Sequence, residues 1–225
     1  MIYFIGDIHG CYEEYLKTIE LIEARDDDPY TVILGDIGFG FDKEFPEVNY
    51  NRHKFFAGNH DQYDLMVDHP GNLGRFGNVK LGQYEFFFIS GAFSVDKEWR
   101  QAYEKKFNKK IWWATEQLSS EEMEVCRHHY EQTKPEAVLS HACPSFCVNY
   151  IYSIHDMPFE KPIYDDTSVF LDQLYHIHAP IRWVHGHMHL KYQFTSYDDC
   201  WFEGVENIDK QEISYKNFHR YMSWM

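Results

Sequence analysis

The chain has 225 residues, of which 44% are hydrophobic and 25% are charged, a balance typical of one globular domain and unlike that of disordered or collagen-like chains. Its formal net charge of −15 argues against a protein that coats long nucleic acid or an anionic membrane, because both need clustered Lys and Arg. The five cysteines form no C-x-x-C pair, and the sequence shows no secretory signal and no membrane-spanning apolar run, so we expect a cytoplasmic protein that contacts no membrane.

Short apolar runs alternate with helical stretches from the start of the chain. Runs at 2–5 and 31–34 predict buried strands, and the apolar residues between them predict a helix over 12–22. A capping-box pattern at Ser119 and Glu122 predicts a helix that ends before Pro135. Further buried strands are expected at 55–57, 137–139 and 181–184, strands of a second sheet at 79–81, 84–90, 192–197 and 201–205, and a third helix at 167–178.

This alternation of strands and helices predicts an α/β layered fold. The chain has no internal repeat, low-complexity tract or Gly/Ser linker, so we expect a single domain over 1–208. The tail at 209–225 mixes aromatic and basic residues and is expected to pack on this domain or on a partner. The aromatic-rich stretch 143–162 has no clear helical period, which predicts a long loop that forms a lid or a substrate wall.

Metal-capable side chains follow each of the five buried runs. Ligands of α/β proteins bind beyond the carboxyl ends of the strands, so we expect these side chains to meet in one cleft. If the chain is extended there, side chains two residues apart share a face, as at His187 and His189. The candidate metal ligands are Asp7, His9, Asp36, Asn59, His141, His187 and His189.

The donor types of this set indicate which metals it suits. Oxygen and nitrogen donors without thiolates favour Mn²⁺, with Fe, Zn or Ni as alternatives, over calcium or a structural zinc ion. Seven ligands are more than one ion needs, so we expect two divalent ions bridged by the carboxylate of Asp36. Such a centre lowers the pKa of a bridging water, and the resulting hydroxide attacks a phosphate ester.

The ordered motifs between residues 6 and 189 resemble those of a known family. They are Asp7-x-His9-Gly10, Gly35-Asp36, Gly58-Asn59-His60-Asp61, His141 and Gly186-His187-x-His189. In this order they resemble the motifs of calcineurin-like metallophosphoesterases. The resemblance implies a four-layer sandwich of two mixed β-sheets flanked by helices. A second stretch, from Ser90 through Arg100 to Glu116, is similar to small metallophosphoesterases of bacteria and phages.

The same resemblance implies a role for each motif residue. One ion would be held by Asp7, His9, Asp36 and His189, and the other by Asp36, Asn59, His141 and His187. His60 matches the family's histidine that binds the phosphate and protonates the leaving oxygen. The family's phosphoprotein phosphatases carry G-D-x-x-D-R-G at this motif. Residues 35–40 of this chain keep the first Gly and Asp but lack the second Asp and the Arg. Asp61 is therefore a candidate to orient the His60 ring, with a helix cap as its alternative role, and His185 stays outside the ligand set.

The expected activity is hydrolysis of a phosphomonoester by this dinuclear centre. Hydrolysis of phosphodiesters or nucleotides with the same ions is the alternative, and a non-catalytic scaffold is a third hypothesis. All seven ligand positions and His60 are filled, which argues against a scaffold. Arg100 is the candidate that binds the substrate phosphate, because a guanidinium fork pairs with its oxygens; an ordinary surface arginine is the alternative.

Overall fold

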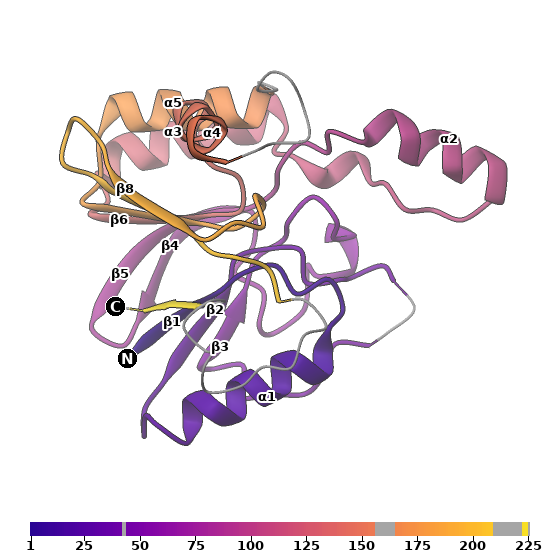
Figure 1. Ribbon diagram of the computed structural model, residues 1–225, viewed down its shortest axis with the longest axis horizontal. Coiled ribbons are helices and arrows are strands. Elements are labelled where there is room, and N and C mark those ends of the chain that lie inside the picture. Colours follow the sequence, from indigo (N-terminus) through magenta and orange to yellow (C-terminus); the bar gives the residue numbers. More distant parts are fainter. Residues whose placement is uncertain (42–43, 156–164, 209–221, 225) are drawn as a thin grey trace.

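The computed structural model describes residues 1–41, 44–155, 165–208 and 222–224, which form two β-sheets (Figure 1). The four-stranded sheet has the order β10-β1-β2-β3, with bounds Met222–Trp224, Ile2–Ile5, Tyr30–Ile33 and His53–Phe55. The six-stranded sheet has the order β4-β5-β6-β7-β9-β8, with bounds Phe76–Leu81, Tyr84–Ile89, Ala137–Ser140, Arg182–His185, Trp201–Gly204 and Tyr192–Thr195.

Both sheets mix parallel and antiparallel strands. In the first sheet β1, β2 and β3 are parallel, while β10 pairs antiparallel with β1. In the second sheet β5, β6, β7 and β9 are parallel, while β4 and β8 are antiparallel edge strands. The parallel strands of each sheet therefore end at one edge, where the loops with the candidate ligands begin.

Helices cover the outer faces of the two sheets and complete four layers (Figure 1). Helix α1 (Tyr12–Glu23) buries one apolar face against the four-stranded sheet. Helices α3 (Ser120–Thr133), α4 (Ser145–Ile154) and α5 (Asp166–Ile177) cover the six-stranded sheet. Helix α2 (Lys97–Phe107) extends away from the body (Figure 1), and short 3₁₀ turns lie at Tyr63–Leu65 and Ala114–Glu116.

The inner faces of the sheets pack on each other through aromatic rings. Phe4 meets Phe86 edge-on with ring centroids 5.6 Å apart, and Phe56 stacks on Phe88 at 5.9 Å. All four residues of β1 are buried, as expected for a strand covered on both faces. The four-layer arrangement of mixed sheets and helices is thus confirmed.

Two helices were not predicted, for different reasons. Helix α4 occupies most of the stretch expected to be a loop, and that expectation was wrong for Ser145–Ile154. Most residues of this helix are apolar or aromatic, and its few polar residues did not reveal a helical period in the sequence. Helix α2 buries only Arg100, so it has no apolar face toward the core. Residues 156–164 of the expected loop lie outside the described residues.

The capping box at the start of α3 is confirmed. The backbone N–H of Glu122 donates to Oγ of Ser119, and the backbone N–H of Ser119 donates to the carboxylate of Glu122. Of the 209–225 tail, the structure describes only 222–224, which form β10, so the domain boundary at 208 stays a prediction. None of the described helices combines the length and the hydropathy needed to cross a bilayer.

Candidate metal centre

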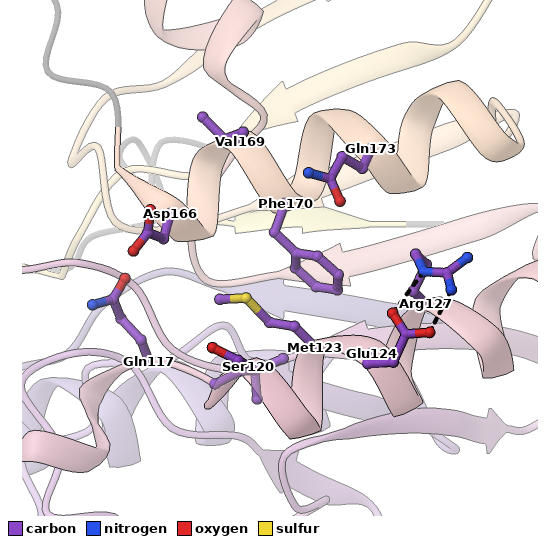
Figure 2. Close-up of a pocket in the computed structure, with 10 residues that line it drawn as sticks. Gln117, Ser120, Met123, Glu124, Arg127, Asp166, Val169, Phe170 and Gln173 are labelled. Atoms are coloured by element: carbon purple, nitrogen blue, oxygen red, sulfur yellow. Dashed lines mark hydrogen bonds and ion pairs between the residues drawn. The ribbon is translucent and has the colours of Figure 1, made fainter.

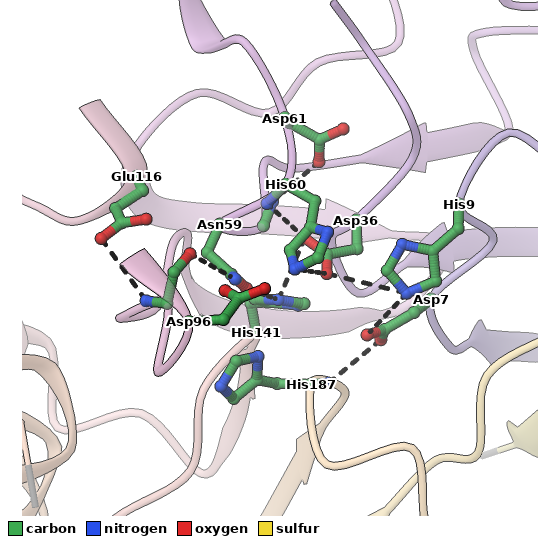
Figure 3. A network of polar contacts seen from close by, with 12 residues as sticks. Asp7, His9, Asp36, Asn59, His60, Asp61, Asp96, Glu116, His141 and His187 are labelled. Carbon is green, nitrogen blue, oxygen red and sulfur yellow. Dashed lines mark hydrogen bonds and ion pairs between the residues drawn. The ribbon is translucent and has the colours of Figure 1, made fainter. Parts of the chain in front are cut away.

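Four of the candidate ligands lie together beyond the ends of β1, β2 and β7, and Figure 3 labels three of them, Asp7, His9 and Asp36. They are Asp7, His9, Asp36 and His189, and one ligand atom from each lies within 4.8 Å of all the others. Nε2 of His189 is 3.0 Å from Oδ2 of Asp7 and also 3.0 Å from Nε2 of His9. This group, called cluster 1 below, brings together the residues expected to bind the first ion.

A second group, cluster 2, consists of Asp36, His141 and His187, with Asn59 beside them. Nε2 of His141 lies 3.3 Å from Oδ1 of Asp36 and 3.0 Å from Oδ1 of Asn59. The amide of Asn59 donates from Nδ2 to Oγ of Ser94 at 2.9 Å, which leaves its oxygen facing the cluster. Asp36 belongs to both clusters, with Oδ1 toward His141 and Oδ2 3.9 Å from His9.

The backbone sets the tautomer of His141. Its Nδ1 donates to the carbonyl oxygen of Leu34 at 2.7 Å, so Nε2 is the ring nitrogen that faces Asp36 and Asn59. A histidine that ligates a metal almost always donates its other ring N–H in this way.

The unpaired acceptors of cluster 1 provide a test of whether these residues fit a cation. Oδ2 of Asp7 is buried and has no geometrically defined hydrogen bond among the described residues, although Nε2 of His189 lies 3.0 Å away. The facing Nε2 atoms of His9 and His189 converge on the same space. A buried carboxylate oxygen without a partner is unfavourable unless a positive charge lies beside it, so the donor set fits a divalent cation.

Four of the candidate ligands have a left-handed backbone. The φ angles are 43° at His9, 52° at Asp36, 66° at His187 and 53° at His189. This conformation is uncommon for residues other than glycine, and it clusters at functional sites. The expectation that His187 and His189 share one face of an extended chain was therefore wrong. The turn sends His189 to cluster 1 and His187 to cluster 2.

Two glycines let other chain segments approach the ligands closely. A Cβ atom at Gly58 would lie 2.1 Å from Oδ1 of Asp36, and one at Gly186 would lie 2.5 Å from Oδ1 of Asp7. Neither position can therefore hold a side chain while the carboxylates keep their places. Close approach, as well as sharp turning, accounts for the glycines in these motifs.

The charges of the two clusters depend on one another. Burial alone would raise the pKa of Asp36, but His141 and His60 hold it well below its usual range. Burial would lower the pKa of His141, but Asp36 and Asp7 raise it to about 9. His187 has no equally close carboxylate, and burial lowers its pKa to about 3. The carboxylates are thus ionised and His187 is neutral at pH 7, as metal ligands must be, whereas His141 has to release a proton when a cation binds.

A cavity of about 380 Å³ opens beside the clusters. Asp36, Asn59, His187 and His189 line it on the cluster side, and His60 and Arg100 line it as well. Another hollow, of about 440 Å³, lies between α3 and α5 (Figure 2). None of the candidate ligands lines that hollow, and its Arg127 is paired with Glu124, so we assign the site to the first cavity.

Arg100 contacts His60 at this cavity. Nη2 of Arg100 lies 3.2 Å from Nδ1 and 3.0 Å from Nε2 of His60. An atom nearly equidistant from both ring nitrogens would collide with Cε1 if it lay in the ring plane, so the guanidinium lies against the ring face. Nε of Arg100 donates to Oδ1 of Asp96 at 2.7 Å and Nη1 donates to the carbonyl of Ile111 at 3.1 Å. Arg100 is buried, so it is not an ordinary surface arginine.

A family model described as calcineurin-like phosphoesterase matches residues 1–191 of the chain. The chain belongs to this family. The match covers every candidate metal ligand, His60 and Arg100.

Curated relatives match a smaller part of the chain. Over 99 residues the chain is 36% identical to the symmetrical bis(5'-nucleosyl)-tetraphosphatase of Buchnera aphidicola subsp. Acyrthosiphon pisum strain Tuc7, and equally to that of strain 5A. The match covers 42% of this chain and 34% of the relative, so it spans about a third of the relative's length.

Solved structures resemble the chain distantly. A protein of Streptococcus pneumoniae, described as a predicted phosphoesterase, has 10% identity and a TM-score of 0.43, with 95% of this chain and 75% of that chain covered. A hypothetical protein of Thermus thermophilus has 11% identity and a TM-score of 0.48, with 92% and 76% covered.

Asp61 does not orient the His60 ring, and that expectation was wrong. Its Oδ1 accepts from the N–H groups of Gly38 and Phe39, and its Oδ2 accepts from those of Ile37 and Gly58. The carboxylate therefore joins the loops that follow β2 and β3, and it caps no helix. Burial and nearby Asp36 raise its pKa to about 6, although the four N–H donors oppose this. Its neighbour in sequence, His60, touches Arg100 instead.

Residues of the stretch 94–116 support the site from behind. Ser94, which accepts from the Asn59 amide, lies near Glu116, and the backbone N–H of Ser94 donates to Oε1 of Glu116 at 3.4 Å. The indole N–H of Trp112 donates to the other oxygen of Glu116 at 2.7 Å. The likeness of this stretch to small family members was the only signal for these contacts in the sequence.

His185 lies beside the ligands but turns away from both clusters. Its Nδ1 donates to the carbonyl of Gly186 at 2.9 Å, and its Nε2 accepts from the hydroxyl of Tyr192. Both ring nitrogens are thus occupied within the protein. Burial lowers the pKa of His185 to about 4, so it is neutral at pH 7.

Proposed function

We propose that the chain hydrolyses phosphate monoesters with two divalent cations, one held by cluster 1 and one by cluster 2. The observation that carries this proposal is the shared, buried Asp36 on the floor of a cavity that His60 and Arg100 also line. Two bound cations would activate a water as the nucleophile and neutralise charge on the phosphate. Mn²⁺ is the cation we expect first, because the donors are carboxylate, amide and imidazole.

The protein's own residues bind the phosphate and support departure of the alcohol. The guanidinium of Arg100 is held by Asp96, and it presents its remaining N–H groups toward the cavity, where they can pair with phosphate oxygens. Because Arg100 lies against the face of the His60 ring, it does not occupy the in-plane directions of the two ring nitrogens. One of these nitrogens can therefore donate a proton to the leaving oxygen. Burial lowers the pKa of His60 and the charge of Arg100 adds to this, while Asp36 opposes both.

Hydrolysis of a phosphodiester or a polyphosphate is the second candidate. Its support is the name of the Buchnera relatives, which are tetraphosphatases, although the match spans only about a third of their length. The same clusters would serve either reaction, because monoesters and diesters would be hydrolysed with the same two cations. They would differ in the groups that the cavity must accommodate around the phosphate. A non-catalytic scaffold is disfavoured, because both clusters are complete.

Parallel assays with 4-nitrophenyl phosphate and bis(4-nitrophenyl) phosphate in Mn²⁺ separate these functions. We expect turnover of the monoester to exceed that of the diester, and a chelator to abolish both. Faster turnover of the diester would reverse the preference. If protein with two bound metal equivalents turned over neither ester, the non-catalytic scaffold would be the remaining hypothesis. Asp64→Asn, at an exposed carboxylate outside the cavity, is the matched control for Asp36→Asn.

A further inference from the structure

The cavity has an apolar side that the proposed chemistry does not use. Two of its residues come from the segment that joins β5 to α2, two lie one helical turn apart on α4, and one lies between the histidines of the two clusters. We call them the apolar wall: Phe93, Val95, Val148, Tyr152 and Met188. Hydrolysis of the ester bond needs none of these side chains, so their role must concern the rest of the substrate.

The size of the cavity shows that more than a phosphate fits. Its volume of about 380 Å³ lies within the usual range of sites for small organic ligands. At ~30 Å³ per water molecule, this space equals roughly a dozen waters. A phosphate with five heavy atoms fills less than half of it, so the remainder adjoins the apolar wall.

The charges at the cavity argue against a second phosphate in that remaining space. Arg100 is the single lysine or arginine among the described residues that line it, and its Nε is already paired with Asp96. Asp165, whose carboxylate caps α5, lines the cavity as well. A polyphosphate chain that left the clusters would therefore meet carboxylates and apolar side chains without a further cation.

We propose that the apolar wall binds an uncharged aromatic group of the substrate, so that the preferred substrates are monophosphate esters of aromatic alcohols. This inference rests on the proposed phosphomonoesterase function and names its substrate class. Aromatic rings prefer contact with other rings and with methionine sulfur, and Phe93, Tyr152 and Met188 offer both. The wall thereby separates this chain from an enzyme that is selective for long phosphate chains.

A comparison of benzyl phosphate with ethyl phosphate tests whether the apolar wall binds an aromatic group, because the two esters have similar leaving groups. Both are esters of primary alcohols, so their leaving groups depart with similar ease and differ mainly in the apolar ring. With Mn²⁺ we expect kcat/KM to be about 10- to 100-fold higher for benzyl phosphate, as expected for burial of one aromatic ring. Tyr152→Ala should reduce this ratio about fivefold, through loss of the ring contact.

Tyr150→Ala is the matched control on the same helix. Its ring packs on Phe194 at a centroid distance of 4.3 Å and does not line the cavity, so this variant should keep the native ratio. Equal kcat/KM for the two esters, an unchanged ratio in Tyr152→Ala, or a higher kcat/KM for a dinucleoside tetraphosphate than for benzyl phosphate would each overturn the inference.

Binding of phosphonates distinguishes failure of the wall from failure of the proposed function. Benzylphosphonate and ethylphosphonate have no ester bond, so calorimetry on the Mn²⁺-loaded protein reports binding alone. We expect tighter binding of benzylphosphonate, by about 10-fold or more, and loss of most of this difference in Tyr152→Ala. If neither ester is hydrolysed, the phosphomonoesterase proposal fails, and equal binding of the two phosphonates would overturn the wall independently.

Discussion

The two sides of the cavity are built in different ways. The cluster side consists of short loops after β1, β2, β3, β6 and β7, where left-handed residues and close-packed glycines hold each ligand. The apolar side consists of one face of α4 and the segment before α2, whose wall residues have no left-handed backbone, together with Met188 from the loop after β7. On the cluster side, therefore, the ligands cannot shift without a clash or a strained backbone. The apolar side contacts the substrate only through its shape and hydrophobicity. Catalysis should depend on the first and selectivity on the second.

The largest effect is expected from Asp36→Asn. The substitution removes the negative charge that both clusters share and replaces one of the two oxygens by an NH2 group, so we expect activity to be abolished and metal content to fall well below two equivalents. Metal analysis of the dialysed protein and turnover of 4-nitrophenyl phosphate measure this. Two equivalents of metal in the variant would show that Asp36 does not bridge the clusters.

His60→Ala should separate proton transfer from metal binding. We expect kcat to fall by about 10²- to 10⁴-fold, the usual range for general acid catalysis, with metal content unchanged. The loss should be smaller for 4-nitrophenyl phosphate than for benzyl phosphate, because a weakly basic phenolate departs without a proton. Stoichiometric loss of metal, or an equal loss of rate for both esters, would contradict the assigned role.

Arg100→Ala should act mainly on substrate binding. Loss of a charge-assisted hydrogen bond to phosphate predicts a KM higher by about 10- to 100-fold, with a smaller fall in kcat. Arg127→Ala is the matched control, because that arginine also pairs with a carboxylate but lies at the hollow between α3 and α5 (Figure 2). A fall in kcat as deep as that of His60→Ala would show that Arg100 acts chiefly by positioning His60.

The smallest effect concerns the free energy of unfolding. It tests whether His185, unlike the ligands beside it, has a structural role with both ring nitrogens bonded within the protein. Burial lowers the pKa of His185 to about 4 in the folded protein, so the unfolded chain binds the proton more readily below pH 6.5. The stability from neutral His185 is present above that pH and is lost as pH falls. Metal-free protein should lose about 2 kcal/mol from this group between pH 7 and pH 5.

Urea unfolding in chelator at pH 7 and pH 5 measures this loss. His185→Gln should be less stable than the native chain at pH 7, because its contacts with Gly186 and Tyr192 change. Its unfolding free energy should nevertheless fall less between the two pH values, since Gln does not titrate. The same decrease in both proteins would show that other groups carry the pH dependence.

The sequence by itself determined the strands other than β10, the cap of α3 and the identity of the residues that meet at the site. Five buried runs that each end in metal-capable side chains suffice for this, because parallel strands in a layered fold deliver their ends to a common edge. The capping box at Ser119 is equally local, since it depends on residues three apart. These patterns can be read from the sequence without knowledge of how the elements pack.

Only the tertiary structure decided how those residues are arranged. The family resemblance implied that His187 and His189 bind different ions, but the left-handed turns that separate them follow from no period in the sequence. The use of Asp61 to join two loops, and the contact of Arg100 with the His60 ring, arise between segments 20 or more residues apart. Most residues of helix α4 are apolar or aromatic, so only its packing shows which of them face the cavity. Local patterns encode backbone period, whereas the direction of a side chain at a turn depends on the neighbours that fold against it.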